Sequence, residues 1–213
     1  MQKERNKIIS GFTLVETLVA LAIFTLGIAA TVLVFSKTIK NKAYALEMGK
    51  SSFVVSRSMG DLIGYLRRVR QSDAGAYPIV TANSNELVVY SDYDKDGKTE
   101  RLRISLSGGK VYLEIRRPST TFPKTYAADY ESPIELAKQI VNDSINDPMF
   151  SYYNKDYPAD TINNPVDVPA DVSQIRLIKI FLKINIDPNR APDNIQQQSF
   201  VELRNLNDYD RIY

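Results

Sequence analysis

The stretch GFTLVETLVALAIF at residues 11–24 opens an apolar run that continues to Phe35 and contains a single charged residue, Glu16. A helix needs about 20 apolar residues to cross the hydrocarbon core of a bilayer, and this run is long enough. An acid at the centre of such a helix costs about 2.5–3.5 kcal/mol on insertion scales, and less near an end. The chain is therefore expected to hold a membrane-length helix near its N-terminus, and its carboxylate needs a functional reason.

Two ordinary interpretations of this segment leave Glu16 without a role. A cleaved secretory signal has a basic start, here Lys3, Arg5 and Lys7, and small residues for the cut, here at 27–30. The apolar run extends past that point, however, and an acid is unexpected inside it. A plain signal anchor explains the length of the run but not the acid. Basic residues on both sides of the run leave its orientation undecided.

A third interpretation accounts for the acid. The residues Gly11-Phe12-Thr13-Leu14-Val15-Glu16, with a short basic leader before them and an apolar helix after them, closely resemble the processing motif of the type IV prepilin-like family, which includes the minor pseudopilins of type II secretion. The resemblance implies that residues 1–11 are a leader and that a membrane prepilin peptidase cuts between Gly11 and Phe12. It also implies that the new amine of Phe12 is methylated.

The same resemblance implies a role for Glu16 in filament assembly, where it pairs with the N-terminal amine of a neighbouring subunit. A carboxylate in hydrocarbon is costly when alone and much less costly beside a well-placed cation. Because only a correctly staggered neighbour supplies that cation, the pair can set the register of the filament. The implied partners are other pilin or pseudopilin subunits, the peptidase and the assembly machinery of the cytoplasmic membrane. The implied location is a single-pass protein with a cytoplasmic N-terminus and an extracytoplasmic head, which then enters a filament.

The sequence predicts an α+β fold, in which a long N-terminal helix packs on an antiparallel β head. Residues 12–35 form the membrane-spanning half of the helix. Over 36–72 the polarity rises while apolar residues still recur at spacings of three and four, which predicts an amphipathic continuation. A stop is expected at 72–75, where Ser-Asp-Ala-Gly precedes Pro78.

The head, residues 77–213, changes to a period of two that is typical of strands. Ser132-Pro133-Ile134-Glu135 forms a capping-box pattern and predicts one short helix over 133–142. Residues 154–172 are rich in proline and are expected to form a long loop. The expected strands are Ile79–Ala82, Leu87–Tyr90, Leu102–Leu106, Val111–Ile115, Phe150–Tyr153, Gln174–Ile186 and Ser199–Leu206, the last two paired with each other.

The hairpin between the second and third of these strands is acidic at its tip. Asp92, Asp94 and Asp96, followed by Gly97, match the first half of an EF-hand calcium loop. The twelfth position of such a loop is a bidentate Glu, but here it is Arg103. A true EF-hand is therefore not expected. Two interpretations stay open, namely a calcium site formed by the three aspartates and an ordinary acidic hairpin tip.

Composition limits the remaining classes of function. The chain has no His and no Cys, which removes disulfides, His- and Cys-based metal sites and nucleophile–His triads. The formal net charge of +2 gives no general argument for a nucleic-acid partner. None of the catalytic motifs for phosphate, acyl or metal chemistry is present, and no enzyme activity or resident cofactor other than calcium is predicted.

The primary hypothesis is a structural filament subunit. The head is larger than expected for a repeating major subunit and lacks the C-terminal disulfide of many major pilins, which favours a minor pilin or pseudopilin. The alternative is a filament-borne binding module for adhesion or DNA uptake, in which Arg101 and Arg103 share one strand face. A third class, a membrane-tethered enzyme or sensor, needs no filament and would keep its leader.

Overall fold

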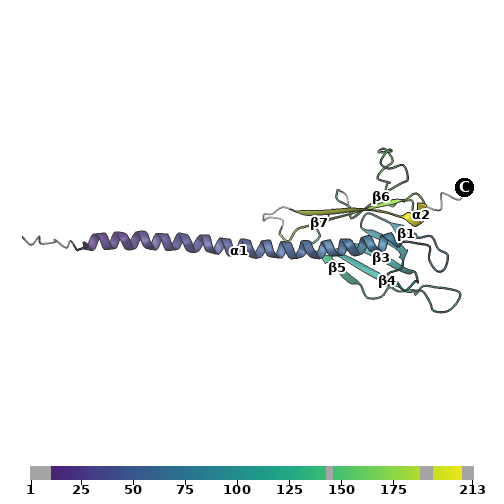
Figure 1. Cartoon of the computed structure of the whole chain (residues 1–213), viewed down its shortest axis with the longest axis horizontal. Helices are drawn as coiled ribbons and strands as arrows, with labels where there is room; N and C mark the ends of the chain where they lie inside the picture. Colours follow the sequence, from purple (N-terminus) through teal and green to yellow (C-terminus); the bar gives the residue numbers. More distant parts are fainter. Residues whose placement is uncertain (1–10, 143–145, 188–193, 208–213) are drawn as a thin grey trace, which may run out of the picture. The chain divides into compact units, whose positions relative to one another are not determined.

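The structure is a computed structural model that describes residues 11–142, 146–187 and 194–207. The chain divides into two compact units, Met1–Glu47 and Met48–Tyr213. One helix, α1 (Leu14–Arg67), contributes residues to both units. Figure 1 labels the elements in chain order. The predicted α+β class, a long N-terminal helix packed on antiparallel β structure, is confirmed.

In the first unit, the described chain is the N-terminal part of α1. Its side chains are exposed from Gly11 to Ala43, although most of those before Ser36 are apolar. By length and composition α1 contains a segment that can cross a membrane. An apolar helix that the described residues leave exposed needs another apolar environment, and a bilayer supplies one.

The second unit contains two antiparallel sheets and the C-terminal part of α1. The larger sheet follows chain order as an antiparallel meander, with its longest connection between β4 and β5. The smaller sheet has β7 at its centre, and a short helix, α2 (Arg204–Asn207), follows it. The larger sheet consists of β1 (Ile79–Ala82), β2 (Glu86–Ser91), β3 (Glu100–Ser107), β4 (Lys110–Arg116) and β5 (Ile134–Lys138), and the smaller of β6 (Phe150–Tyr153), β7 (Leu177–Ile184) and β8 (Ile195–Glu202).

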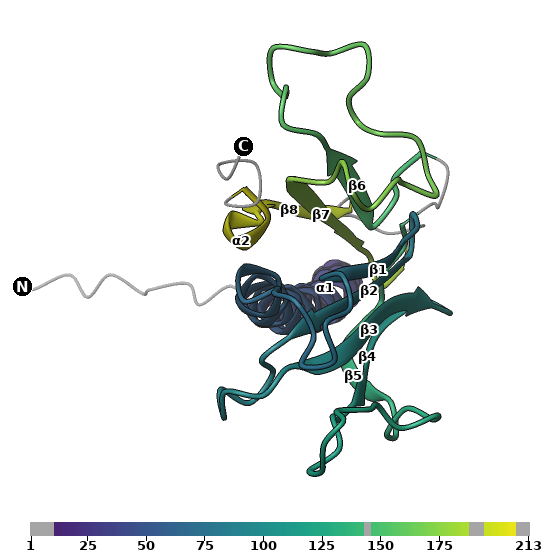
Figure 2. The same ribbon diagram turned by 90° about the vertical axis from the view of Figure 1, so that its right-hand side faces the viewer.

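The core of the second unit forms where α1 meets the inner faces of both sheets. In Figure 2 the helix lies with β1–β5 on one side and with β7, β8 and α2 on the other. The buried side chains of α1 recur at spacings of three and four, as expected for one helical stripe. Four of them, Val55, Met59, Leu62 and Leu66, belong to one apolar cluster with residues of both sheets.

The predicted helix over 133–142 is wrong, because residues Ile134–Lys138 form the edge strand β5. This strand pairs with β4, with Val111 opposite Ala137 and Leu113 opposite Ile134. A capping box stabilises a helix end by about 1 kcal/mol, whereas β5 satisfies a whole row of backbone groups on β4. The free edge of β4 therefore outweighs the local helix signal.

Several other boundaries shift by a few residues. The stem helix ends at Arg67 rather than at residue 72. The predicted strand Ser199–Leu206 is correct only in its first part, because β8 begins at Ile195 and α2 replaces its end. Its predicted pairing with the preceding strand is confirmed. The predicted strands of the larger sheet and the strand at Phe150–Tyr153 are confirmed.

Candidate functional site

Two places in the chain carry the predicted site residues. The first is the start of α1. Gly11 and Phe12 precede the helix as irregular backbone, and the Phe12 side chain is 86% exposed. The peptide bond between them is thus accessible from solvent in the described structure. Glu16 lies in the first turn of α1 and is exposed.

The Glu16 carboxylate is held by Thr13 in a capping box. Its Oε2 atom accepts a hydrogen bond from the Thr13 backbone N–H at 2.8 Å and another from the Thr13 hydroxyl at 2.9 Å. The Glu16 N–H donates to the Thr13 hydroxyl oxygen at 3.3 Å. This arrangement satisfies backbone donors that a helix start leaves without partners. Within the described residues, no hydrogen bond reaches the second oxygen, Oε1.

Sequence reasoning missed Thr13 as a partner of the acid. The signal was available, since Thr13-Leu14-Val15-Glu16 has the T-x-x-E spacing of a capping box. The acid also suits its position, because a negative charge in the first turn favours the helix dipole. Local helix chemistry therefore accounts for where the carboxylate points. It does not account for keeping a charge within an apolar segment.

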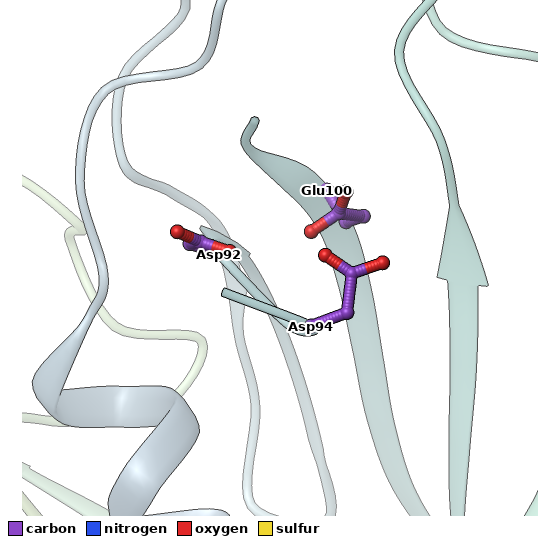
Figure 3. A group of neighbouring side chains, drawn as sticks. All are labelled: Asp92, Asp94 and Glu100. Carbon is purple, nitrogen blue, oxygen red and sulfur yellow. The ribbon is translucent and has the colours of Figure 1, made fainter. Parts of the chain in front are cut away.

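The second place is the acidic hairpin between β2 and β3. Figure 3 shows Asp92, Asp94 and Glu100 turned toward one another. One carboxylate oxygen from each lies within 4.8 Å of the other two. Asp96 is not part of this group, because its Oδ2 pairs with the Lys98 ammonium at 2.6 Å. The structure thus brings together two of the three predicted aspartates and replaces the third by Glu100.

Arginines hold this hairpin from several sides. Arg68 donates to the Asp92 carbonyl at 2.8 Å, and Arg70 donates to the Gly97 carbonyl at 2.6 Å. Arg117 pairs with the Asp94 carboxylate at 2.8 Å. Arg68 and Arg70, which follow α1, therefore have a structural role, because they anchor the hairpin to the end of the helix.

The three carboxylates fit part of a calcium coordination shell. Calcium–oxygen distances of about 2.3–2.6 Å place ligand oxygens within roughly 5 Å of one another, but the ion takes six to eight oxygens. The Oδ1 atom of Asp92 is buried without a hydrogen-bond partner, which suits an added cation. Arg117 already neutralises Asp94 in part, which opposes one. The calcium prediction therefore stays a prediction, now with Glu100 in place of Asp96.

The residue at the twelfth position of the EF-hand pattern takes no part in this cluster. Arg103 pairs instead with Glu86 and Glu114 on the neighbouring strands. The hairpin is flanked by the paired strands β2 and β3, whereas an EF-hand loop lies between two helices. This agrees with the expectation that it is not a true EF-hand.

Glu100 is the buried member of the group, with 1% of its surface exposed. Burial raises the pKa of its carboxyl group above the ordinary value of 4.5, and the negative charges of Asp94 and Asp96 act in the same direction. The Tyr93 N–H, which donates to Glu100 Oε2 at 2.9 Å, opposes this rise in pKa. An acid with a raised pKa in the folded state stabilises the fold below its unfolded pKa. That contribution is lost as pH rises through the folded pKa.

The substitution Glu100→Gln is therefore expected to raise the thermal midpoint at neutral pH in the presence of a chelator. The amide oxygen keeps the hydrogen bond from Tyr93, while the buried charge is removed. The gain should shrink as pH falls toward the ordinary pKa of a Glu, where the wild-type carboxyl is already protonated. Thermal unfolding of the full chain in detergent micelles, followed by circular dichroism, measures this. Glu135→Gln is the matched control, because its exposed pair with Lys110 is worth about 0–1 kcal/mol.

Wild type and Glu100→Gln also test the calcium prediction. A cation held by the cluster raises the wild-type midpoint when Ca²⁺ is added, and Glu100→Gln removes most of that rise because one ligand is lost. Asp94→Ala should remove it as well. A wild-type midpoint that does not respond to Ca²⁺ makes the loop an ordinary acidic hairpin tip.

The fold and the N-terminal site together define a class of protein. Its members have one long N-terminal helix with an exposed apolar start, followed by an antiparallel β head. Comparison with known families agrees for the helix start. Residues 6–32 match the family model described as the prokaryotic N-terminal methylation motif. This match indicates a processed N-terminus of the type IV pilin-like kind, and together with the exposed apolar helix it supports anchoring in a membrane. A comparison with curated proteins found no match for the chain.

Proposed function

We propose that this protein is a minor pilin or pseudopilin, a low-copy subunit of a type IV pilus-like or type II secretion filament. Prepilin peptidase cuts the chain between Gly11 and Phe12, the Phe12 amine is methylated, and the head faces away from the cytoplasm. The observation that carries the proposal is the match of residues 6–32 to the methylation motif, together with the exposed apolar start of α1.

Glu16 is the assembly residue in this proposal. Its Oε2 stays with Thr13, and its Oε1 accepts the methylated amine of a neighbouring subunit. A carboxylate with one oxygen already fixed loses less conformational entropy when the amine arrives. The capping box therefore prepares the acceptor for the neighbouring subunit.

The experiment is to shear filaments from cells that make them and to quantify this chain against the major subunit by mass spectrometry. The chain is expected in the filament fraction at much lower copy than the major subunit. Its N-terminal peptide is expected to begin at a methylated Phe12. An unprocessed leader on a chain that stays in the membrane would instead support a tethered enzyme or sensor.

The alternative function, a surface module for adhesion or DNA uptake, depends on the basic face of β3. Arg101 and Arg103 both point away from the core, in keeping with the alternation of that strand. Arg103, however, pairs with Glu86 at 2.9 Å and with Glu114 at 3.1 Å. Of these two arginines, only Arg101 lacks an acid partner among the described residues, which is a weak basis for binding a polyanion. DNA binding that weakens steeply with salt would favour this alternative.

A further inference from the structure

The outer face of the larger sheet carries two arginines that have no acceptor among the described residues. Arg101 on β3 and Arg116 on β4 lie directly opposite each other in the strand register. Side chains in such positions have Cβ atoms about 4.5–5.5 Å apart, and like charges there destabilise the sheet. In the described part of the chain, neither guanidinium makes an ion pair or hydrogen bond, and both Nε atoms are buried without an acceptor.

Two nearby arginines, Arg103 and Arg117, are neutralised by the protein's own acids. Arg103 pairs with two glutamates, as described above. Arg117, which directly follows β4, pairs with Asp94 at 2.8 Å and with Glu131 at 3.0 Å. Among these four arginines, the unpaired positive charge is thus confined to Arg101 and Arg116, and acids flank it.

Tyrosines surround the two arginines. The guanidinium carbon of Arg116 lies 3.9 Å from the centre of the Tyr130 ring. Tyr90 is opposite Arg101 on the other side of β3, and its ring lies 5.1 Å from that of Tyr126. Arginine and tyrosine are the residue types enriched at the energetic centres of protein interfaces. Because the two arginines lie on paired strands, their positions are largely set before any partner binds.

We propose that Arg101 and Arg116 form a docking site for a carboxylate side chain of another protein subunit. Guanidinium groups present parallel N–H donors that match the two oxygens of a carboxylate, and one carboxylate between them removes their mutual repulsion. A nucleic acid needs a continuous basic stripe, whereas here the flanking acids repel a polyanion. The assignment of the partner as a filament subunit rests on the proposed function, but the carboxylate site itself does not.

The first test is an NMR titration of the full chain in detergent micelles, which follows the arginine Nε–H signals. A short peptide with capped ends and a single glutamate is expected to shift the signals of Arg101 and Arg116 to saturation. Either Arg101→Gln or Arg116→Gln should weaken peptide binding about tenfold, the effect of one strong charge-assisted contact. Lys110→Gln is the matched control, because Lys110 lies on the same face of β4 but pairs with Glu135. It should leave binding unchanged.

Two further measurements distinguish a docking site from a structural arginine pair and from a general anion site. Without peptide, Arg101→Gln should not lower the thermal midpoint, because it relieves repulsion between like charges. If Arg101 had a structural role instead, the substitution would lower the midpoint. No shift with the peptide overturns the proposal. Shifts with inorganic phosphate alone would mean an adventitious ion only. Tighter binding of a short DNA duplex than of the peptide, at equal salt, would assign the face to nucleic acid instead.

The second test is in cells, with the double variant Arg101→Gln, Arg116→Gln. Its amount in sheared filaments should fall about tenfold relative to Lys110→Gln. If wild type enters filaments and the double variant enters equally well, the assignment of the partner as a filament subunit is wrong. If wild type itself is absent from filaments, the proposed function fails, and the peptide titration alone decides whether the carboxylate site exists.

Discussion

Glu16→Ala is expected to be processed and inserted into the membrane normally, but to enter filaments at least about a hundredfold less than wild type. Removing one partner of a buried ion pair typically costs about 3–5 kcal/mol, and each 1.4 kcal/mol is a factor of ten in an equilibrium. Insertion should not suffer, since the change removes a charge from an apolar segment. The methylated amine of the neighbouring subunit would lose its acceptor.

The measurement is the ratio of this chain in sheared filaments to that in membranes, together with the mass of its N-terminal peptide. Glu47→Ala is the matched control, because Glu47 is an exposed acid on the same helix but lies outside the apolar run. It should enter filaments as wild type does. Normal incorporation of the Glu16→Ala chain would remove the assembly role of this acid. If the Glu16→Ala chain is not processed, Glu16 acts in cleavage by the peptidase rather than in assembly.

Leu62→Ala should destabilise the second unit by about 2–5 kcal/mol, the usual range for a buried leucine cut back to alanine. Leu62 is 0% exposed and belongs to the core cluster that joins α1 to both sheets. The deletion therefore leaves a cavity that neither sheet can close without losing its own contacts. Chemical denaturation of the full chain in micelles, followed by far-ultraviolet circular dichroism, measures the change.

Phe53→Ala is the control for this experiment, because the Phe53 side chain is 71% exposed and is in the same unit of the chain. Its free energy of unfolding should remain within about 0.5 kcal/mol of wild type, as for most surface changes. Equal effects of the two substitutions would show that the buried stripe of α1 does not hold the sheets together.

Most of the larger sheet was predictable because its signals are local. Strands β3 and β4 alternate between buried and less buried residues. The connections carry turn residues such as Asp96-Gly97, where Gly97 has a φ of +87° that glycine adopts without strain. The edge strand β5 was mistaken for a helix because its capping-box residues are a local signal too. Whether they cap a helix depends on whether a neighbouring strand has a free edge, and four residues cannot reveal that.

The acidic hairpin was also predictable only in part. The alternating aspartates were evident in the sequence, and they predicted a cluster at the tip. The sequence did not reveal that Lys98 holds Asp96 while Glu100, at the start of β3, turns inward beside Asp92 and Asp94. The choice between these carboxylates depends on the register of β2 with β3 and on the arginines around them.

By itself, the sequence determined the N-terminal helix and its motif, because a membrane-length apolar run and a T-x-x-E spacing are contiguous features whose physics needs no distant contact. It also determined the α+β class through its two periodicities. Only the tertiary structure decided which charges remain unpaired. Arg101 and Arg103 look equivalent along the chain, but the register of β3 with its neighbours places Arg103 beside Glu114 and Arg101 beside Arg116. Charge pairing is a property of neighbouring strands, so it appears only once they are in register.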